Sequence, residues 1–231
     1  MTAVFFDYPK AAVFGRVVPK TRIYEHVGAN TALKDLFVTQ VDQIVWKFKL
    51  APETTNLAAT RAVKEIQVFG VSLRTNKLDD EVLRAIDRAI PFPLIFELTW
   101  SGKRKAVATF KRPSETAAAK WVVSEYFATD WGPGDAPRQS LPVALNLGGL
   151  YDAILTAMMP VAKAADEDIQ TRVARMEAIR AKTREVDRIK ARLAREKQFN
   201  KRVVINAELR AVKQELERLS GGAPVSTMKN E

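Results

Sequence analysis

The sequence feature that most constrains the fold is a run of 55 residues without proline or glycine, from Ala165 to Leu219. Proline and glycine are the residues that most often interrupt a helix. Their absence predicts one helix of about 80 Å, at roughly 1.5 Å per residue, or two helices separated by a kink. Gly221 and Gly222 are expected to end this segment, and residues 221–231 are expected to form a disordered tail.

Residues 1–162 precede this run. Their pattern of apolar residues predicts an α+β domain with a small mixed sheet and flanking helices. Residues 163–220 then form a long basic helix or coiled-coil arm. Alternating apolar residues predict strands, and apolar residues three or four apart predict helices. Residues 1–29 are expected to be irregular apart from a short strand at Ala12–Val18. The later elements are a helix over 31–44, strands over 46–50 and 63–73, a helix over 78–90, a strand over 94–100 and a hairpin arm over 104–111.

The positive charge of the chain is concentrated in the arm. The whole chain carries 37 Lys and Arg against 27 Asp and Glu, a net charge of +10. Residues 163–220 contribute 16 basic and 10 acidic side chains, and from Arg172 to Arg202 the count is 12 against 4. Such a stripe attracts polyanions, although a solvated helix face is the alternative interpretation. The twelve candidate nucleic-acid-binding residues are Arg172, Arg175, Arg180, Lys182, Arg184, Arg188, Lys190, Arg192, Arg195, Lys197, Lys201 and Arg202.

Two apolar heptad runs lie within the arm, and they do not share a register. Leu193 and Leu209 are 16 residues apart, two more than two heptads, so a break is expected around Phe199–Lys201. A polar helix this long needs a second helix from a partner, packing onto its own chain, or a nucleic-acid backbone. The candidate coiled-coil or partner interface comprises Val186, Ile189, Leu193, Leu209, Val212, Leu216 and Leu219.

The composition excludes several classes of site. The chain has no cysteine, which removes disulfides and thiolate chemistry, and its single histidine, His26, makes a zinc site or a serine–histidine triad improbable. No apolar run approaches the length of a membrane span, and Met1–Lys20 lacks the pattern of a signal peptide. We therefore expect a cytoplasmic protein that binds no membrane, metal or cofactor, and a non-enzymatic role is favoured.

One candidate catalytic arrangement stands against that expectation. The predicted order of helices and strands resembles the core of restriction-type nucleases, which place a Glu-x-Lys on a strand to hold magnesium and a water. Here the corresponding residues are Glu65 and Gln67, with glutamine in the lysine position, and Glu97 could assist. The alternative is that Glu65 and Gln67 are polar residues that form hydrogen bonds on a half-buried strand.

Several stretches together resemble a bacterial family called domain of unknown function 4391, over nearly the whole chain. The resemblance implies no catalytic residues. It implies a context, because members resemble accessory proteins found beside DNA methyltransferases and helicases in restriction or phage-defence clusters. The stretches that carry it are Trp46–Asn56, Val63–Phe69, Ile86–Pro91, Leu94–Glu97, Lys197–Arg202 and Asn206–Arg210.

These observations predict an accessory subunit of a DNA-processing defence assembly. It would dock a helicase or methyltransferase subunit, and DNA could bind to the basic arm. Two alternatives remain open at this point. One is a metal-dependent nuclease that uses Glu65, and the other is a structural homodimer in which the arms form a coiled coil.

Overall fold

The computed structural model describes residues 4–114 and 121–221, and the chain divides into two compact units. The first unit is Met1–Pro160 and the second is Val161–Glu231. The predicted α+β class is confirmed, with a mixed sheet, flanking helices and a long helical C-terminal segment. Of the predicted disordered tail, residues 222–231 lie outside the described residues.

The first unit is built on a mixed sheet with the strand order β10-β6-β5-β4-β3-β2, and β9 also pairs with β6. Among its described pairings, β4 and β5 run parallel and the others run antiparallel. The strands are β2 (Val13–Val17), β3 (Val41–Leu50), β4 (Ile66–Leu73), β5 (Leu94–Trp100), β6 (Lys103–Ala108), β9 (Phe127–Ala128) and β10 (Gly132–Pro133).

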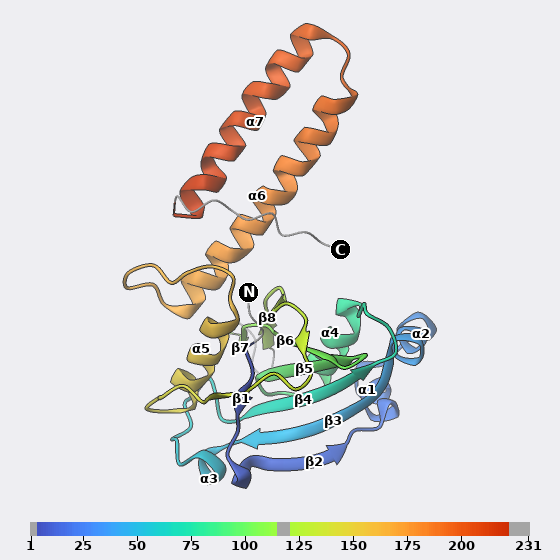
Figure 1. Cartoon of the computed structure of the whole chain (residues 1–231), viewed down its shortest axis with the longest axis vertical. Helices are drawn as coiled ribbons and strands as arrows, with labels where there is room; N and C mark the ends of the chain where they lie inside the picture. The colour runs from blue at the N-terminus through green and yellow to red at the C-terminus, as the bar shows by residue number, and fades with distance from the viewer. Residues whose placement is uncertain (1–3, 115–120, 222–231) are drawn as a thin grey trace. The chain divides into compact units, whose positions relative to one another are not determined.

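Three helices bury one face of this sheet (Figure 1). They are α1 (Lys20–Val27), α2 (Thr31–Gln40) and α4 (Asp80–Ala89). Helix α4 connects the parallel strands β4 and β5, and the Asp79 side chain caps its first turn. The remaining elements are β1 (Phe6–Asp7), η1 (Lys10–Ala12), α3 (Pro52–Thr55), β7 (Lys111–Pro113), β8 (Trp121–Val123), β11 (Gln139–Ser140) and α5 (Leu147–Met158).

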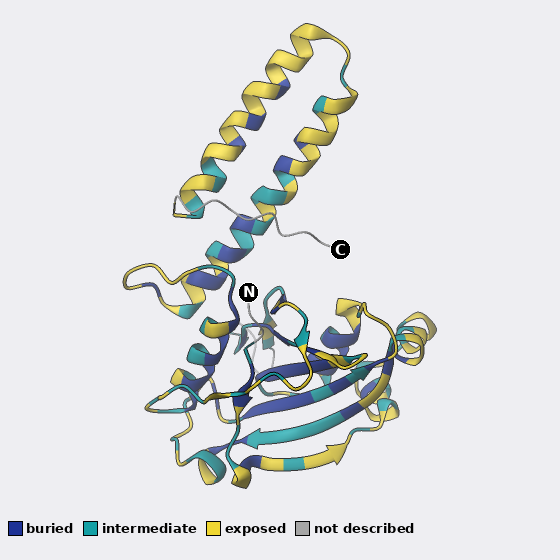
Figure 2. Cartoon of the chain, in the orientation of Figure 1, coloured by how far each residue is buried: buried dark blue, intermediate teal, exposed yellow. Residues whose placement is uncertain are grey.

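The alternation of side chains along β4 and β5 decides which residues share a face. Phe69 and Phe96 are paired in register and belong to the helix-covered core. Because consecutive strand residues point to opposite faces, the next register pair, Gly70 and Glu97, lies on the other face. Figure 2 shows β4 and β5 as largely buried strands.

Two local predictions for the first unit are wrong. Residues 1–29 were expected to lack a helix, but Pro19 and Gly28 delimit α1 as its N-cap and its left-handed C-cap. The helix expected over 31–44 ends at Gln40, and β3 begins at Val41. Val41 and Ile44 are buried in the sheet core, so strand pairing outweighs the helical spacing of their apolar side chains.

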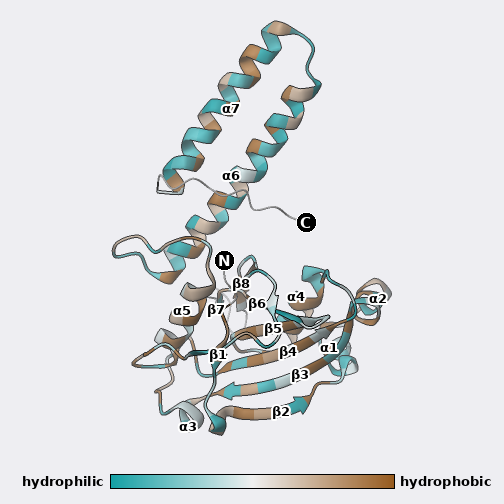
Figure 3. Cartoon of the chain, in the orientation of Figure 1, coloured by the Kyte–Doolittle hydropathy of each residue, from teal (hydrophilic) through white to brown (hydrophobic). Residues whose placement is uncertain are grey.

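The second unit is a helical hairpin in which the 55-residue run forms two helices rather than one. Helix α6 spans Ile169–Arg195 and α7 spans Phe199–Leu219, and the turn between them, Glu196–Gln198, immediately precedes the expected break (Figure 1). Ion pairing between Arg192 and Glu208 and an apolar cluster shared by both helices make them antiparallel neighbours. The hairpin is mostly hydrophilic, with short hydrophobic segments along each helix (Figure 3). Within the described ranges, no helix has both the length and the apolar character needed to cross a membrane.

Candidate nucleic-acid interface

An apolar seam holds the two helices of the hairpin together. Its buried members come from both helices, and Ile205 belongs to it although the heptad spacing did not include this residue. Six of the seven residues predicted for a coiled-coil or partner interface contact one another here within one chain, whereas Leu219 is half-buried outside the cluster. The seam comprises Val186, Ile189, Leu193, Ile205, Leu209, Val212 and Leu216.

Hydrogen bonds from Arg175 stabilise the end of the hairpin where α6 begins and α7 ends. Arg175 makes two hydrogen bonds to the Glu167 carboxylate, of 2.7 and 2.8 Å, and a third, of 2.7 Å, to the carbonyl of Ala162. It also donates to the carbonyl of Leu219 at the end of α7, over 3.3 Å. The hydrogen bonds from Arg175 lower the pKa of Glu167 to about 2, so the pair stays ionised well into acid.

Two further arginines among the twelve candidates also have structural roles. Arg172 is 3% exposed, and its guanidinium donates to the carbonyl of Val161 over 3.0 and 2.5 Å. Arg202 donates to the carbonyls of Leu193 and Glu196, over 3.3 and 3.0 Å, and thereby caps the end of α6. Burial removes Arg172 from the candidate interface, and Arg202 is fixed against the turn.

Three of the remaining candidates pair with acidic neighbours, and four are exposed without an ion pair in the part of the chain that the structure describes. The paired residues are Lys182 with Glu185, Lys190 with Asp187 and Arg192 with Glu208. The exposed residues without an ion pair are Arg188, Arg195, Lys197 and Lys201. Arg184 is exposed and Arg180 is half-buried.

The antiparallel fold gathers the excess charge into one half of the hairpin. Residues 186–212, here called the turn half, contain 8 basic and 3 acidic side chains. The base half, residues 163–185 and 213–220, contains 8 basic and 7 acidic side chains. The turn half therefore holds a net +5 and the base half +1. The linear sequence does not reveal this partition, because it depends on where the chain reverses.

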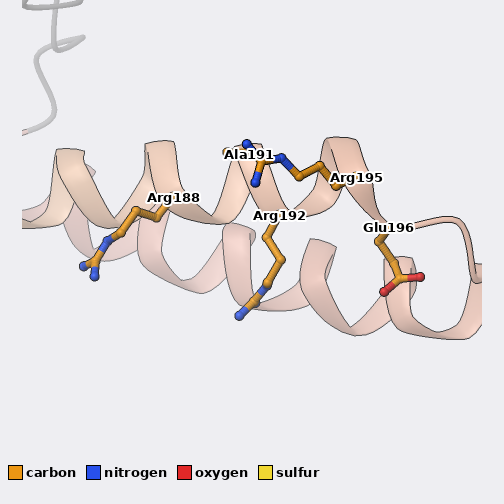
Figure 4. A pocket seen from close by; sticks show the side chains of 5 residues that line it. All are labelled: Arg188, Ala191, Arg192, Arg195 and Glu196. Carbon is orange, nitrogen blue, oxygen red and sulfur yellow. The ribbon is translucent and has the colours of Figure 1, made fainter.

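A shallow hollow of about 440 Å³ lies on α6 within the turn half, lined by Arg188, Ala191, Arg192, Arg195 and Glu196 (Figure 4). The three arginines recur at helical spacings of four and three, and in Figure 4 the Arg188 and Arg192 side chains extend to the same side while Arg195 lies over Ala191. A guanidinium offers several N–H donors in a planar fork that matches the oxygens of a phosphate. This surface of α6 is therefore suited to phosphate groups.

The candidate catalytic carboxylates of the first unit lie on opposite faces of the sheet. Glu97 shares a register pair with Gly70, and Gln67 is three residues earlier on the same strand as Gly70, so Gln67 faces the other way. The Gln67 amide donates to Glu65 over 2.5 Å, and Lys49 lies 3.4 Å from the other Glu65 oxygen. Glu65 and Glu97 cannot hold one metal ion together. Among the described residues, no three His, Cys, Asp or Glu side chains form a metal-binding group.

Glu97 is instead the centre of a buried ion cluster. Arg138 makes two hydrogen bonds to its carboxylate, of 2.7 and 2.8 Å, and Lys47 makes one of 2.6 Å. Burial favours a raised pKa for Glu97, but Arg138 and Lys47 outweigh it and hold the pKa below its usual range. The aliphatic part of the Lys47 side chain lies against Gly70. A Cβ at position 70 would lie only 2.7 Å from Lys47 Cδ, so a larger residue would displace this side chain. All the oxygens of this carboxylate are engaged by cations of the same unit.

A second buried cluster occupies the opposite face of the sheet. Lys111 Nζ donates to the main-chain carbonyls of Asp87 and Ile90, each over 2.5 Å, and lies 3.3 Å from the Asp87 carboxylate. The Tyr126 hydroxyl donates to the same carboxylate. These contacts cap the C-terminal end of α4, where a cation is electrostatically favourable. Sequence reasoning missed this cluster because its members are far apart in the chain.

Comparison with known protein families gives a match over most of the chain. The model of a family described as Domain of unknown function (DUF4391) matches residues 6–216 of the chain. Neither the search of curated proteins nor the search of solved structures gave a match.

Proposed function

The chain belongs to this family of unknown function, and from the geometry of its hairpin we propose that it is a non-enzymatic accessory subunit of a DNA-processing defence assembly. In this proposal the turn half of the hairpin binds the phosphate backbone of DNA. A helicase or DNA methyltransferase subunit is the expected protein partner, on the resemblance described from the sequence.

The observation that carries the proposal is the concentration of exposed positive charge in the turn half. Its net charge of +5 is distributed over two helices that are fixed against each other. Arg188, Arg195, Lys197 and Lys201 are exposed and make no ion pair within the described chain, so their charge is available to a ligand. Neutralising DNA phosphates with such side chains releases condensed counterions and favours binding.

The arrangement of the seam bears on the homodimer alternative. The apolar residues expected to pair with a second copy already contact one another within the chain. A dimer through these residues would require the hairpin to open. DNA binding requires no such rearrangement, and we therefore favour it.

The test is the salt dependence of DNA binding by the full chain. Binding of a labelled duplex is measured by fluorescence anisotropy across a salt series. The double variant Arg188→Gln/Arg195→Gln should weaken binding and reduce the slope of log K against log salt by about 2, since each duplex phosphate contact contributes about 0.9.

The matched control removes the same charge from the base half. Lys163 and Lys213 are exposed, and Lys163→Gln/Lys213→Gln lowers the net charge equally. This control should leave the slope close to that of the unmodified chain. Equal effects of the two double variants, or no binding by the unmodified chain near physiological salt, would reject DNA binding by the turn half.

The partner part of the proposal has a separate test. Co-purification of the full chain with any helicase or methyltransferase subunit encoded beside it should recover a complex at salt high enough to dissociate DNA. Failure to recover either subunit would leave DNA binding as the whole of the proposal.

A further inference from the structure

An aromatic side chain is exposed where the hairpin turns. Phe199, the first residue of α7, is 78% exposed, whereas every other aromatic residue of the described chain is buried or half-buried. Val203 follows one turn later on the same side of α7 and is 53% exposed. Removing an aromatic ring from water is favourable, so a ring left this exposed marks a contact surface when its surroundings fit a partner.

Four basic residues lie close to Phe199 in the sequence. Arg195, Lys197, Lys201 and Arg202 lie within four residues of Phe199, and Glu196 is the one acid among them. The Glu196 carboxylate accepts a hydrogen bond of 2.8 Å from the main chain of Gln198, so it is occupied within the turn. The surface therefore combines one π-face with several positive charges.

The backbone that carries Phe199 is fixed by the turn. Arg202 is tied to the end of α6 by its hydrogen bonds to Leu193 and Glu196, and Ile205 is buried in the seam one turn further along α7. Phe199 is thus the first residue of a helix that is held against α6 by the Arg202 hydrogen bonds and by Ile205 in the seam. A ring on such a backbone requires no backbone ordering when it binds.

A nucleic-acid strand with unpaired bases fits this surface best. Phosphates complement the cations, and a base has a π-face that stacks on an aromatic ring. Inside a duplex both faces of each base are covered by neighbouring pairs, so only a single strand or a junction offers a free face. An anionic lipid surface would also attract the cations, but one ring and two exposed valines are much less than the apolar face of an interfacial helix.

We propose that the hairpin turn is a binding site for unpaired nucleobases, in which Phe199 stacks on a base beside a single-strand–duplex junction. The flanking cations hold the phosphates on either side of that base. This inference rests on the proposed DNA binding and specifies the form of DNA that the turn half prefers.

The experiment compares three DNAs of equal length with the full chain: a blunt duplex, a single strand and a fork. The single strand and the fork carry 2-aminopurine, at the first unpaired position in the fork. Binding should quench the 2-aminopurine fluorescence by stacking. Phe199→Ala should abolish the quench and weaken binding to the single strand and the fork about tenfold, the effect of losing one stacked base, with little change for the blunt duplex.

Two variants serve as controls. Phe199→Trp keeps a π-face and should keep the quench. Val204 is 67% exposed on the same helix but points away from Phe199, so Val204→Ala removes apolar surface without touching the stacking site. It should bind all three DNAs as the unmodified chain does, and the salt slope should be unchanged in Phe199→Ala because no charge is lost.

The outcomes separate this inference from the proposed function. If Phe199→Ala binds the fork and quenches 2-aminopurine normally while Arg188→Gln/Arg195→Gln weakens binding, the stacking site is rejected and DNA binding stands. If the unmodified chain binds none of the three DNAs, both are rejected. Phe199-dependent binding to vesicles of anionic phospholipid, without a quench on DNA, would assign the turn to a lipid surface and overturn the proposal.

Discussion

Two carboxylates of the first unit are buried and paired, whereas several cations of the hairpin's turn half are exposed. In the first unit, Glu97 is buried between Arg138 and Lys47, and Asp87 is buried between Lys111 and Tyr126. In the turn half, Arg188 and Arg195 are exposed and unpaired within the described chain. Charge in these two clusters is paired within the fold, whereas the exposed charge in the turn half is the charge that the proposed DNA binding would use.

The largest expected effect tests the structural side of this comparison. Glu97→Ala removes a buried carboxylate from Arg138 and Lys47, which are 22% and 34% exposed, and breaking such a cluster destabilises by at most about 3–5 kcal/mol. The free energy of unfolding, measured by urea denaturation, should fall by up to that amount. Glu53, whose ion pair with Lys49 is exposed, provides the control, and Glu53→Ala should change stability far less than Glu97→Ala does. Similar losses for both variants would contradict the distinction.

A smaller effect is expected from pH, at the base half of the hairpin. Hydrogen bonds from Arg175 lower the pKa of Glu167 to about 2 in the folded chain. A depressed carboxyl pKa stabilises the fold above the unfolded value, about 4.3 for Glu, and this contribution is lost as pH falls towards 2. The stability difference between the unmodified chain and Glu167→Gln, followed by circular dichroism, should therefore shrink between about pH 4.3 and 2. A difference that does not change over this window would show that the pair is not linked to folding.

The smallest effect is expected in the turn half. Arg188→Gln/Arg195→Gln removes two exposed charges that support no contact of the fold, so the free energy of unfolding should change by less than about 0.5 kcal/mol. Reduced repulsion among neighbouring cations acts in the stabilising direction. The same denaturation experiment checks this, and a loss comparable to that of Glu97→Ala would make these arginines structural residues.

The sequence predicted the fold where local patterns decide the structure. The alternation over 63–73 and 94–100 identified β4 and β5, and the mismatch between Leu193 and Leu209 indicated a break close to the observed turn. The short helix α1 was missed because Pro19 and Gly28 were interpreted as interruptions rather than as its two caps.

The parts that could not be predicted depend on contacts between distant residues. Periodicity identifies an apolar stripe on a helix but not the surface that covers it, so the seam between α6 and α7 was one of three alternatives. The Glu97 cluster joins residues 50 and 41 positions apart, and no local pattern marks such an arrangement. Arg172 and Arg202 carry the same charge as Arg188 in the sequence, and only the structure shows that the first two donate hydrogen bonds to main-chain carbonyls.

The antiparallel pairing of α6 and α7 has a consequence for the electric field at the turn. Every α-helix has a macrodipole, equivalent to roughly half a positive charge at its N-terminus and half a negative charge at its C-terminus. At the turn, the C-terminus of α6 adjoins the N-terminus of α7, so these two partial charges largely cancel. The potential there is then set by side chains alone. A few surface substitutions can therefore reverse the polarity of the turn, and with it the class of ligand, while the hairpin backbone stays unchanged.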